Sequence, residues 1–145
     1  MADPIAGPGE RDLGSLLRSM RPRLHGPVYL FATLPEGQEL PDGMRPILRF
    51  HEAEGVTVIV EHAAAVAAGL AGVFPCRMIT LEVHSALDAA GFLAAVTACL
   101  AAGGIGVNPV AAFHHDHLFV PRDRAEEAMR ALRGLAARHG QEVTP

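Results

Sequence analysis

The stretch CRMITLEVH at residues 76–84 decides the fold class, because side chains of two kinds alternate along it. Such alternation predicts a β-strand with at least one buried face. A helix is predicted next, over residues 87–102, and the glycine pair at 103–104 ends it. Ser85 and Asp88 have the S-x-x-D spacing of a capping box, in which each side chain accepts a hydrogen bond from an otherwise unpaired N–H group.

The sequence after this helix completes a known structural unit. It predicts a strand over residues 105–113, a tight turn over residues 114–117 and a return strand over residues 118–120. A last helix is predicted from Asp123 to about Arg138. The order β-α-β-β-α is that of a ferredoxin-like unit without its final strand. We therefore expect the missing strand to come from elsewhere in the chain or from a partner.

The first half of the chain predicts a similar unit that lacks the first helix. After a Pro/Gly-rich start, expected to be loose, the predicted elements are a helix (12–20), a strand (28–34), a loop (35–46), two strands (47–52 and 56–61) and a helix (63–70). The Glu54-Gly55 pair provides the hairpin turn between the last two strands, because glycine tolerates a positive φ.

An internal repeat supports two related halves. PILRFH at residues 46–51 matches PVAAFH at residues 109–114, with a constant offset of 63 residues from Pro46 to Pro109. Duplication explains the match, and chance similarity between short apolar segments explains it as well; the same strand order in both halves would favour duplication. The expected organisation is a flexible start and short helix, an N-terminal half and a C-terminal half, at residues 1–23, 24–72 and 73–145.

Composition and charge exclude several classes of protein. The 145 residues are 50% hydrophobic and 19% charged with a net charge of −4, which is typical of a globular chain and argues against a nucleic-acid partner. All 12 basic residues are arginine, so P-loop phosphate binding through lysine and Schiff-base catalysis are excluded. No apolar run predicts a membrane span, and no secretory signal is visible. With only two cysteines, Cys76 and Cys99, we expect a protein of the reducing cytoplasm.

Three stretches carry a family resemblance: RMITLEVHSALDAAGFLAAV, GIGVNPVAAFHHDHLFVP and FHEAEGVTVIVE. They resemble a bacterial family of small proteins with tandem ACT-like domains, related to the ACT pairs of CASTOR-type arginine sensors. The similarity runs from about Leu24 to Leu135 and implies an α/β (α+β) fold of two ferredoxin-like halves. ACT domains bind amino acids or similar small ligands and often dimerise by joining their sheets. The resemblance thus implies a non-catalytic regulatory protein with a small-molecule ligand, no cofactor and a homodimeric assembly.

The resemblance also implies a ligand site between the loop after the predicted strand and the next strand, at His84, Ser85, Ala86, Leu87, Val107 and Asn108. A helix N-terminus in this loop suits the carboxylate of an amino acid, because free N–H groups and the positive end of the helix dipole attract an anion. A simple capped helix is the alternative. Ser85 and Asp88 would then occupy those N–H groups, and Asp88 would repel an anion.

The histidine-rich segment FHHDH at residues 113–117 is the second candidate site. His114 and His115 are candidate ligand-binding residues. Imidazoles and a carboxylate are also zinc ligands, which makes a metal site the second reading, formed by His114, His115, Asp116 and His117. The alternative is a polar hairpin whose histidines bond to the backbone or line a pocket.

Three functions remain: an amino-acid-binding regulatory module, a metal-binding protein, and a structural module whose exposed sheet edges pair chains. No catalytic residue is predicted. His84 and Ser85 do not suggest a base and its nucleophile, since neighbouring strand residues point to opposite faces. Stabilisation by an amino acid would favour the first function, and metal in the purified protein would favour the second.

Overall fold

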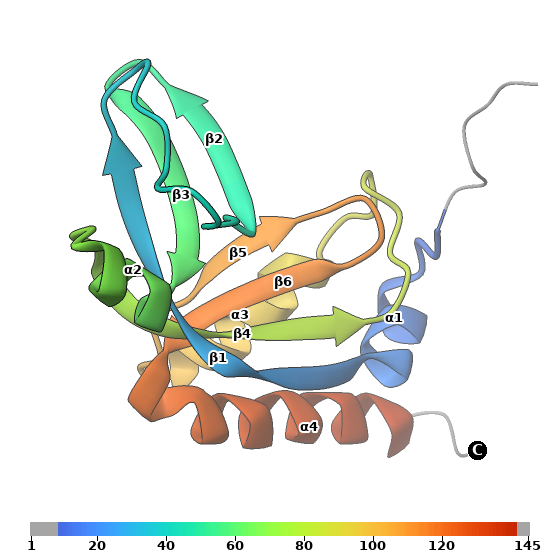
Figure 1. Ribbon diagram of the computed structural model, residues 1–145. Helices are drawn as coiled ribbons and strands as arrows, with labels where there is room; N and C mark the ends of the chain where they lie inside the picture. The colour runs from blue at the N-terminus through green and yellow to red at the C-terminus, as the bar shows by residue number, and fades with distance from the viewer. Residues whose placement is uncertain (1–8, 142–145) are drawn as a thin grey trace, which may run out of the picture.

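The computed structural model describes residues 9–141. Within this range the chain forms one six-stranded sheet with four α-helices and a short 3-10 helix (Figure 1). The elements are α1 (Leu13–Ser19), β1 (Arg21–Leu34), β2 (Leu48–Glu52), β3 (Gly55–Glu61), α2 (His62–Ala68), β4 (Val73–Glu82), α3 (Phe92–Ala102), β5 (Asn108–Ala111), β6 (Asp116–Pro121), η1 (Arg122–Arg124) and α4 (Ala125–Gln141). None of these helices is long and apolar enough to cross a membrane. The loose start expected for residues 1–10 falls mostly outside the described range.

The sheet contains the same three-strand pattern twice. Its order is β2-β3-β1-β4-β6-β5, and all neighbouring strands run antiparallel. In each half the second strand lies at the sheet edge, the third strand lies next to it, and the first strand lies in the middle. The first strands, β1 and β4, join the halves. This equal order supports duplication and confirms the predicted fold of two ferredoxin-like halves, of which the first has a loop in place of its first helix.

The strand missing from the C-terminal unit comes from within the chain. β1 pairs with β3 through residues 29–34. It pairs with β4 through residues 21–24 and again between residues 28 and 31, so its first part takes the place beside β4 that the final strand of a ferredoxin-like unit occupies. The predicted strand start at residue 28 is therefore wrong. Pro22, which predicts the end of the preceding helix, also lies inside β1. A register shift between Leu24 and Val28 accommodates the bend there.

The strand register corrects the offset of the repeat. Leu48 lies opposite Ile59 in the first half, and Asn108 lies opposite Phe119 in the second. Ile59 and Phe119 each lie two residues before the end of the third strand, and both belong to the same apolar cluster. Leu48 is therefore equivalent to Asn108, and the predicted match of Pro46 with Pro109 is wrong by three residues.

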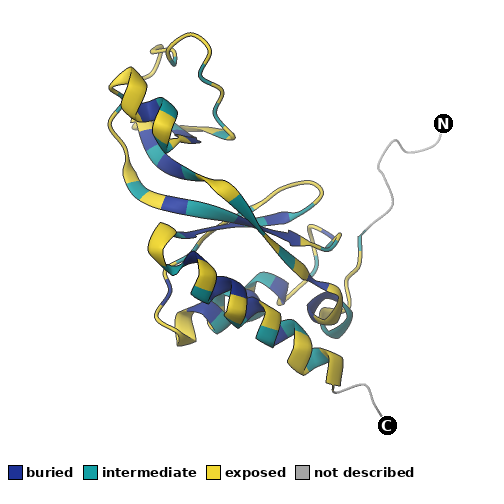
Figure 2. Ribbon diagram, turned by 60° about the horizontal axis from the view of Figure 1, so that its bottom comes forward, coloured by how far each residue is buried: buried dark blue, intermediate teal, exposed yellow. Residues whose placement is uncertain are grey.

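Helices cover the outer face of the curled sheet. α1, α3 and α4 pack against the C-terminal half, where Leu81, Leu118 and Leu132 are inaccessible to solvent. α2 packs on the N-terminal half around Ala65, with the loop before β2 beside it. Figure 2 shows buried residues on the sides of the helices that face the sheet. The short predicted N-terminal helix is confirmed as α1, and the side chain of Asp12 caps it by accepting from the N–H of Ser15 at 2.8 Å.

The inner face of the sheet is only partly filled. A small aromatic cluster connects the two halves, with Phe119 in edge-to-face contact with Tyr29 and Phe31 at centroid distances of 6.2 and 5.6 Å. The β2–β3 hairpin stands away from β4, β5 and β6 in Figure 1. The two faces therefore differ: the outer face is packed under helices, and the inner face has a cavity of about 220 Å³ between the halves.

Candidate functional site

The start of α3 differs from the prediction. The helix begins at Phe92 instead of residue 87, and its N-cap is Gly91, whose φ of +91° favours glycine. Among residues 9–141, no side chain caps α3. The first N–H groups of a helix have no partner within the helix, so they form a partly positive surface at its N-terminus.

Ser85 and Asp88 do not form the predicted capping box, which is wrong, because other parts of the chain hold both side chains. The Ser85 hydroxyl donates a hydrogen bond to the Asp116 carboxylate at 3.2 Å. The Asp88 carboxylate accepts two hydrogen bonds from the Arg11 guanidinium, at 2.9 and 3.1 Å. The expected repulsion of an anion by Asp88 is thereby reduced, since its charge is paired with an arginine.

A pocket of about 120 Å³ lies at the N-terminus of α3. The β4–α3 loop, the first turn of α3 and the β5–β6 strands line it, through Ser85, Ala86, Leu87, Ala89, Gly91, Phe92, Leu93, Ala94, Ala111 and Asp116. Pockets for drug-sized ligands measure about 300–1,000 Å³. This space therefore suits a smaller molecule.

Within the described part of the chain, Asp116 is the one charged residue that lines this pocket. It is 6% exposed and lies on β6, on the face that points to the helices together with Leu118 and Val120. Burial raises the pKa of its carboxyl, whereas the hydrogen bond from Ser85 and the nearby imidazoles of His117 and His115 act in the opposite direction. A buried carboxylate with one hydroxyl partner can still accept hydrogen bonds from a cation.

The structure brings together part of the predicted ligand set. Ser85, Ala86 and Leu87 line the pocket. The other predicted residues lie outside its lining: His84, Val107, Asn108, His114 and His115. Ala111 and Asp116 form the opposite wall instead. The sequence contains a signal for the inward position of Asp116. If the predicted return strand is extended back by two residues, the alternation of strand side chains places Asp116 on the same face as Leu118 and Val120.

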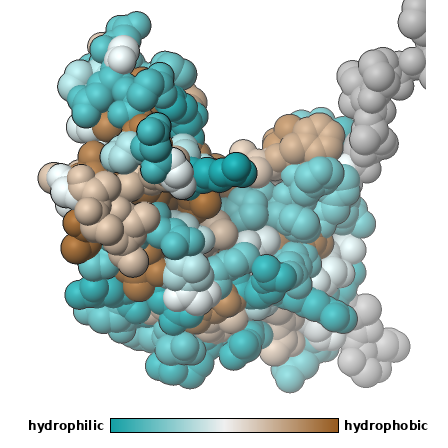
Figure 3. Space-filling view, in the orientation of Figure 1, coloured by the Kyte–Doolittle hydropathy of each residue, from teal (hydrophilic) through white to brown (hydrophobic). Residues whose placement is uncertain are grey.

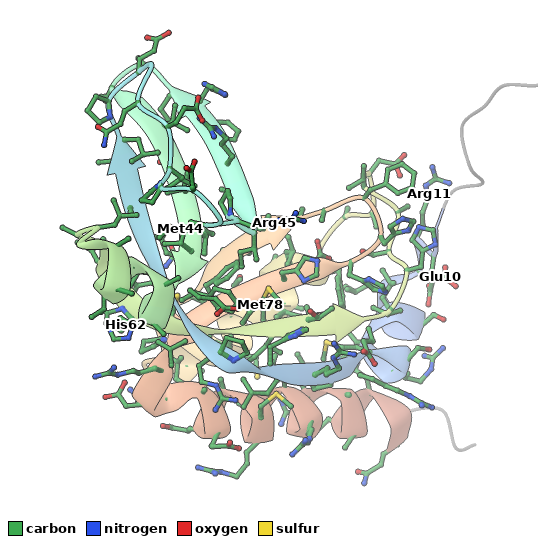
Figure 4. The ribbon with its side chains drawn as sticks, in the orientation of Figure 1. Glu10, Arg11, Met44, Arg45, His62 and Met78 are labelled. Carbon is green, nitrogen blue, oxygen red and sulfur yellow. The ribbon has the colours of Figure 1, made fainter. Side chains whose placement is uncertain are left out.

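Residues 9–12, which we name the N-terminal strap, hold the β4–α3 loop in place (Figure 4). The N–H of Glu10 donates to the carbonyl of His84, and the N–H of Ala86 donates to the carbonyl of Glu10, both at 2.9 Å. The ion pair between Arg11 and Asp88 adds a side-chain contact, although both groups are exposed and contribute little to stability. The strap therefore positions the loop mainly through its backbone.

Gly9→Ala is expected to release the strap, because a Cβ at this position would lie 2.7 Å from the carbonyl oxygen of His84 and 2.8 Å from the nitrogen of Ala86. The expected loss is about 1–3 kcal/mol in the free energy of unfolding. Urea unfolding measures the loss, and faster hydrogen exchange at the Ala86 amide reports the release. Gly26→Ala is the control, since its Cβ meets nothing within 4 Å. Equal exchange at Ala86 in all three proteins would contradict this role of the strap.

The predicted histidine turn is displaced along the chain. The turn closes where the N–H of Ala112 donates to the carbonyl of His115 at 3.0 Å, so Asp116 and His117 lie on β6. His114 is exposed and its ring lies 6.2 Å from that of His84. Among the described residues, no group of three or more metal-binding side chains is placed to hold a metal ion. The geometry therefore gives no support to the metal site at residues 114–117.

His117 points to the inner face of the sheet, opposite to Asp116. Its Nδ1 lies 2.9 Å from the Thr80 hydroxyl, which in turn lies 2.8 Å from Nε2 of His25. Burial lowers the pKa of both imidazoles, and charge repulsion from His115 and from Arg23 adds to the effect at His117 and His25 respectively.

Two ferredoxin-like halves that share one sheet define a tandem α+β domain protein. Two family models, each described as an ACT domain, match residues 8–77 and residues 73–134. The structure is similar to that of VC0802 from Vibrio cholerae, a protein of unknown function described as a possible transport protein. That match has 40% identity and a TM-score of 0.77, and covers 86% of this chain and 95% of that one. The chain belongs to the ACT domain family, as a tandem ACT protein.

Two more distant structures share the fold. The protein Atu0741 from Agrobacterium tumefaciens is 19% identical with a TM-score of 0.67, and the match covers 81% of this chain and 89% of that one. The regulatory subunit of aspartate kinase from Thermus thermophilus is 10% identical with a TM-score of 0.58, over 82% of this chain and 97% of that one. No curated protein sequence matches the chain.

Proposed function

We propose that this protein is a non-catalytic regulatory module that binds a small free amino acid in the pocket at the N-terminus of α3. The observation that carries the proposal is the pairing of opposite charges in that pocket. The first turn of α3 lines one side, through Phe92, Leu93 and Ala94, and the carboxylate of Asp116 lines the other. A zwitterionic amino acid has a negative carboxylate that suits the helix N-terminus and a positive ammonium group that suits Asp116.

The carboxylate of the ligand would accept hydrogen bonds from the uncapped N–H groups of α3, which also present the positive end of the helix dipole. Its ammonium group would donate to Asp116, where the hydroxyl of Ser85 occupies only part of the acceptor capacity. The ion pair of Arg11 with Asp88 keeps a second carboxylate from repelling the ligand. The volume of about 120 Å³ favours a small side chain.

Binding of this kind acts through an equilibrium between conformations or assemblies, because a ligand shifts such an equilibrium by its different affinities for the two states. We propose a homodimer as that assembly. β2 and β5 form the two edges of the sheet, and each edge has unpaired main-chain groups that a second copy could pair with. The resemblance to a regulatory subunit of aspartate kinase supports a regulatory role through its fold alone.

A thermal-shift screen of the standard amino acids tests the proposal. A ligand that binds only the folded protein raises the melting temperature in proportion to the logarithm of its concentration, and we expect this for one or more small amino acids. Ala111→Leu should remove the effect, because Ala111 lines the pocket and its exposed position tolerates a larger side chain. Ala112→Leu is the matched control outside the pocket. Absence of stabilisation by every amino acid would overturn the proposal.

A further inference from the structure

The inner face of the sheet contains a second cavity, of about 220 Å³, between the N-terminal and C-terminal halves. Ile47 and Leu48 line it from the β2 side, and Val110, Met78 and Phe119 line it from the C-terminal half. We name it the inner-face cavity. Figure 3 shows a notch between the β2–β3 hairpin and the β5–β6 strands in this region. The cavity is larger than the pocket at α3 and lies on the other side of the sheet.

One polar side chain, His117, interrupts the apolar lining of the inner-face cavity. Its Nδ1 is bound to the hydroxyl of Thr80, so Nε2 is the ring nitrogen available to a ligand. Thr80 is only 7% exposed and also contacts Nε2 of His25. We name the hydrogen-bonded series His117–Thr80–His25 the relay. Among the described residues, no buried side-chain polar atom lacks a partner, so the relay is satisfied without a ligand.

The relay can present His117 in two forms. The Thr80 hydroxyl has one hydrogen, so it donates to one imidazole and accepts from the N–H of the other. When it donates to His117, Nε2 of that ring carries the hydrogen and donates to a ligand. When it donates to His25, Nε2 of His117 accepts. A hydroxyl group suits both forms, since it can either accept or donate.

The side chains that line the cavity favour an uncharged ligand over an ionic one. No charged side chain of the described residues lines it, and burial lowers the pKa of His117 and of His25, which favours the neutral form of both rings at pH 7. Arg45 lies above Met78 at the base of the β2–β3 hairpin (Figure 4), but it is exposed and outside the lining. A charged ligand group would therefore find no oppositely charged partner in the described lining. The cavity therefore favours an uncharged molecule.

We propose that the inner-face cavity is a second small-molecule site, and that it takes a compact apolar molecule with one uncharged hydroxyl group, which bonds to Nε2 of His117. Such a ligand would contact both halves and limit the movement of the β2–β3 hairpin relative to β4, β5 and β6. The site is independent of the proposed amino-acid pocket, because the two lie on opposite faces of the sheet and share no lining residue.

Phenol is the test ligand, and the methyl groups of ¹³C-methionine are the NMR probes. We expect a saturable shift of the Met78 signal, because Met78 lines the cavity. Met20 and Met129, which are 2% and 3% exposed in the helix-side core, should not shift. Benzoate, which has the same ring and a charge, should bind less tightly than phenol. No shift of Met78, or tighter binding of benzoate, would overturn the proposal.

Substitutions at two adjacent alanines distinguish the two sites experimentally. Ala112 lines the inner-face cavity and Ala111 lines the pocket at α3, and both are exposed, so leucine at either position should leave the fold intact. Ala112→Leu should abolish phenol binding, whereas Ala111→Leu should leave it unchanged. Retained binding in Ala112→Leu would contradict the location of the site. Failure of the amino-acid screen would leave these phenol results unaffected.

Thr80→Val tests the hydrogen bond separately from the apolar contacts. The substitution keeps the shape of the side chain and removes the hydroxyl that orients His117. Phenol affinity should fall about three- to tenfold, which corresponds to one hydrogen bond. Toluene has no hydroxyl, so its affinity should change less than about twofold. An equal effect on phenol and toluene would show that the relay plays no part in recognition.

Discussion

Leu118→Ala is expected to lower the free energy of unfolding by about 2–5 kcal/mol, the range for a large-to-small change in a packed core. Leu118 is inaccessible to solvent and lies in the middle of β6, with Ile79 opposite it on β4. It belongs to the cluster that connects the sheet with α1, α3 and α4. The substitution therefore leaves a cavity where three helices meet the sheet. Urea unfolding followed by circular dichroism measures the change.

Leu87→Ala is the matched control, because it makes the same chemical change at a leucine that is 71% exposed. Its effect on stability should remain within about 0.5 kcal/mol. If both variants lose the same stability, then the packing of β6 against the helices does not dominate the stability of the C-terminal half.

Asp116→Asn is expected to stabilise the protein at neutral pH and to weaken amino-acid binding at the same time. Burial raises the pKa of Asp116 above that of the unfolded chain, so ionisation of this carboxyl opposes folding. Asparagine has no charge to bury, and its side-chain oxygen can still accept the hydrogen bond from Ser85. The lost interaction with the ammonium group of the ligand should reduce affinity about tenfold to a hundredfold.

The stability difference between Asp116→Asn and the wild type should depend on pH. A carboxyl with a raised folded-state pKa stabilises the fold most when protonated, below its unfolded value of about 4. That contribution is lost as the pH rises through the folded-state pKa. The melting temperature of Asp116→Asn should therefore exceed that of the wild type at pH 7, and the difference should shrink toward pH 3. A variant that is less stable at pH 7 and still binds amino acids would contradict a ligand role for Asp116.

Local patterns in the sequence predict several elements of the fold. Alternation in residues 76–84 predicts β4, and the glycines at 103–104 correctly predict the end of α3. The start of β1 was not predictable in the same way. Residues 21–24 become a strand by pairing with β4, more than fifty residues later in the chain, and Pro22 locally indicates a break.

The pocket at α3 contains only part of the ligand set that the sequence predicts, for a related reason. Ser85 and Asp88 have the spacing of a local capping box, but their partners are Asp116 and Arg11, at sequence separations of 31 and 77 residues. Tertiary contacts at such separations leave no signal in the local pattern. The family resemblance placed Ser85, Ala86 and Leu87 at a ligand site, and the pocket contains them. The facing wall with Asp116 depends on the start of β6, which lies two residues before the predicted start at Leu118.

Amino-acid binding at the N-terminus of α3 is tested most directly by the amide NMR spectrum during titration with the amino acid that stabilises the protein most. We expect the largest shifts at the amides of Phe92, Leu93 and Ala94, because these groups would donate to the ligand carboxylate. The corresponding amine, which lacks that carboxylate, should shift them much less. Saturable binding that leaves these three amides unchanged, or equal shifts with the amine, would contradict the proposed site.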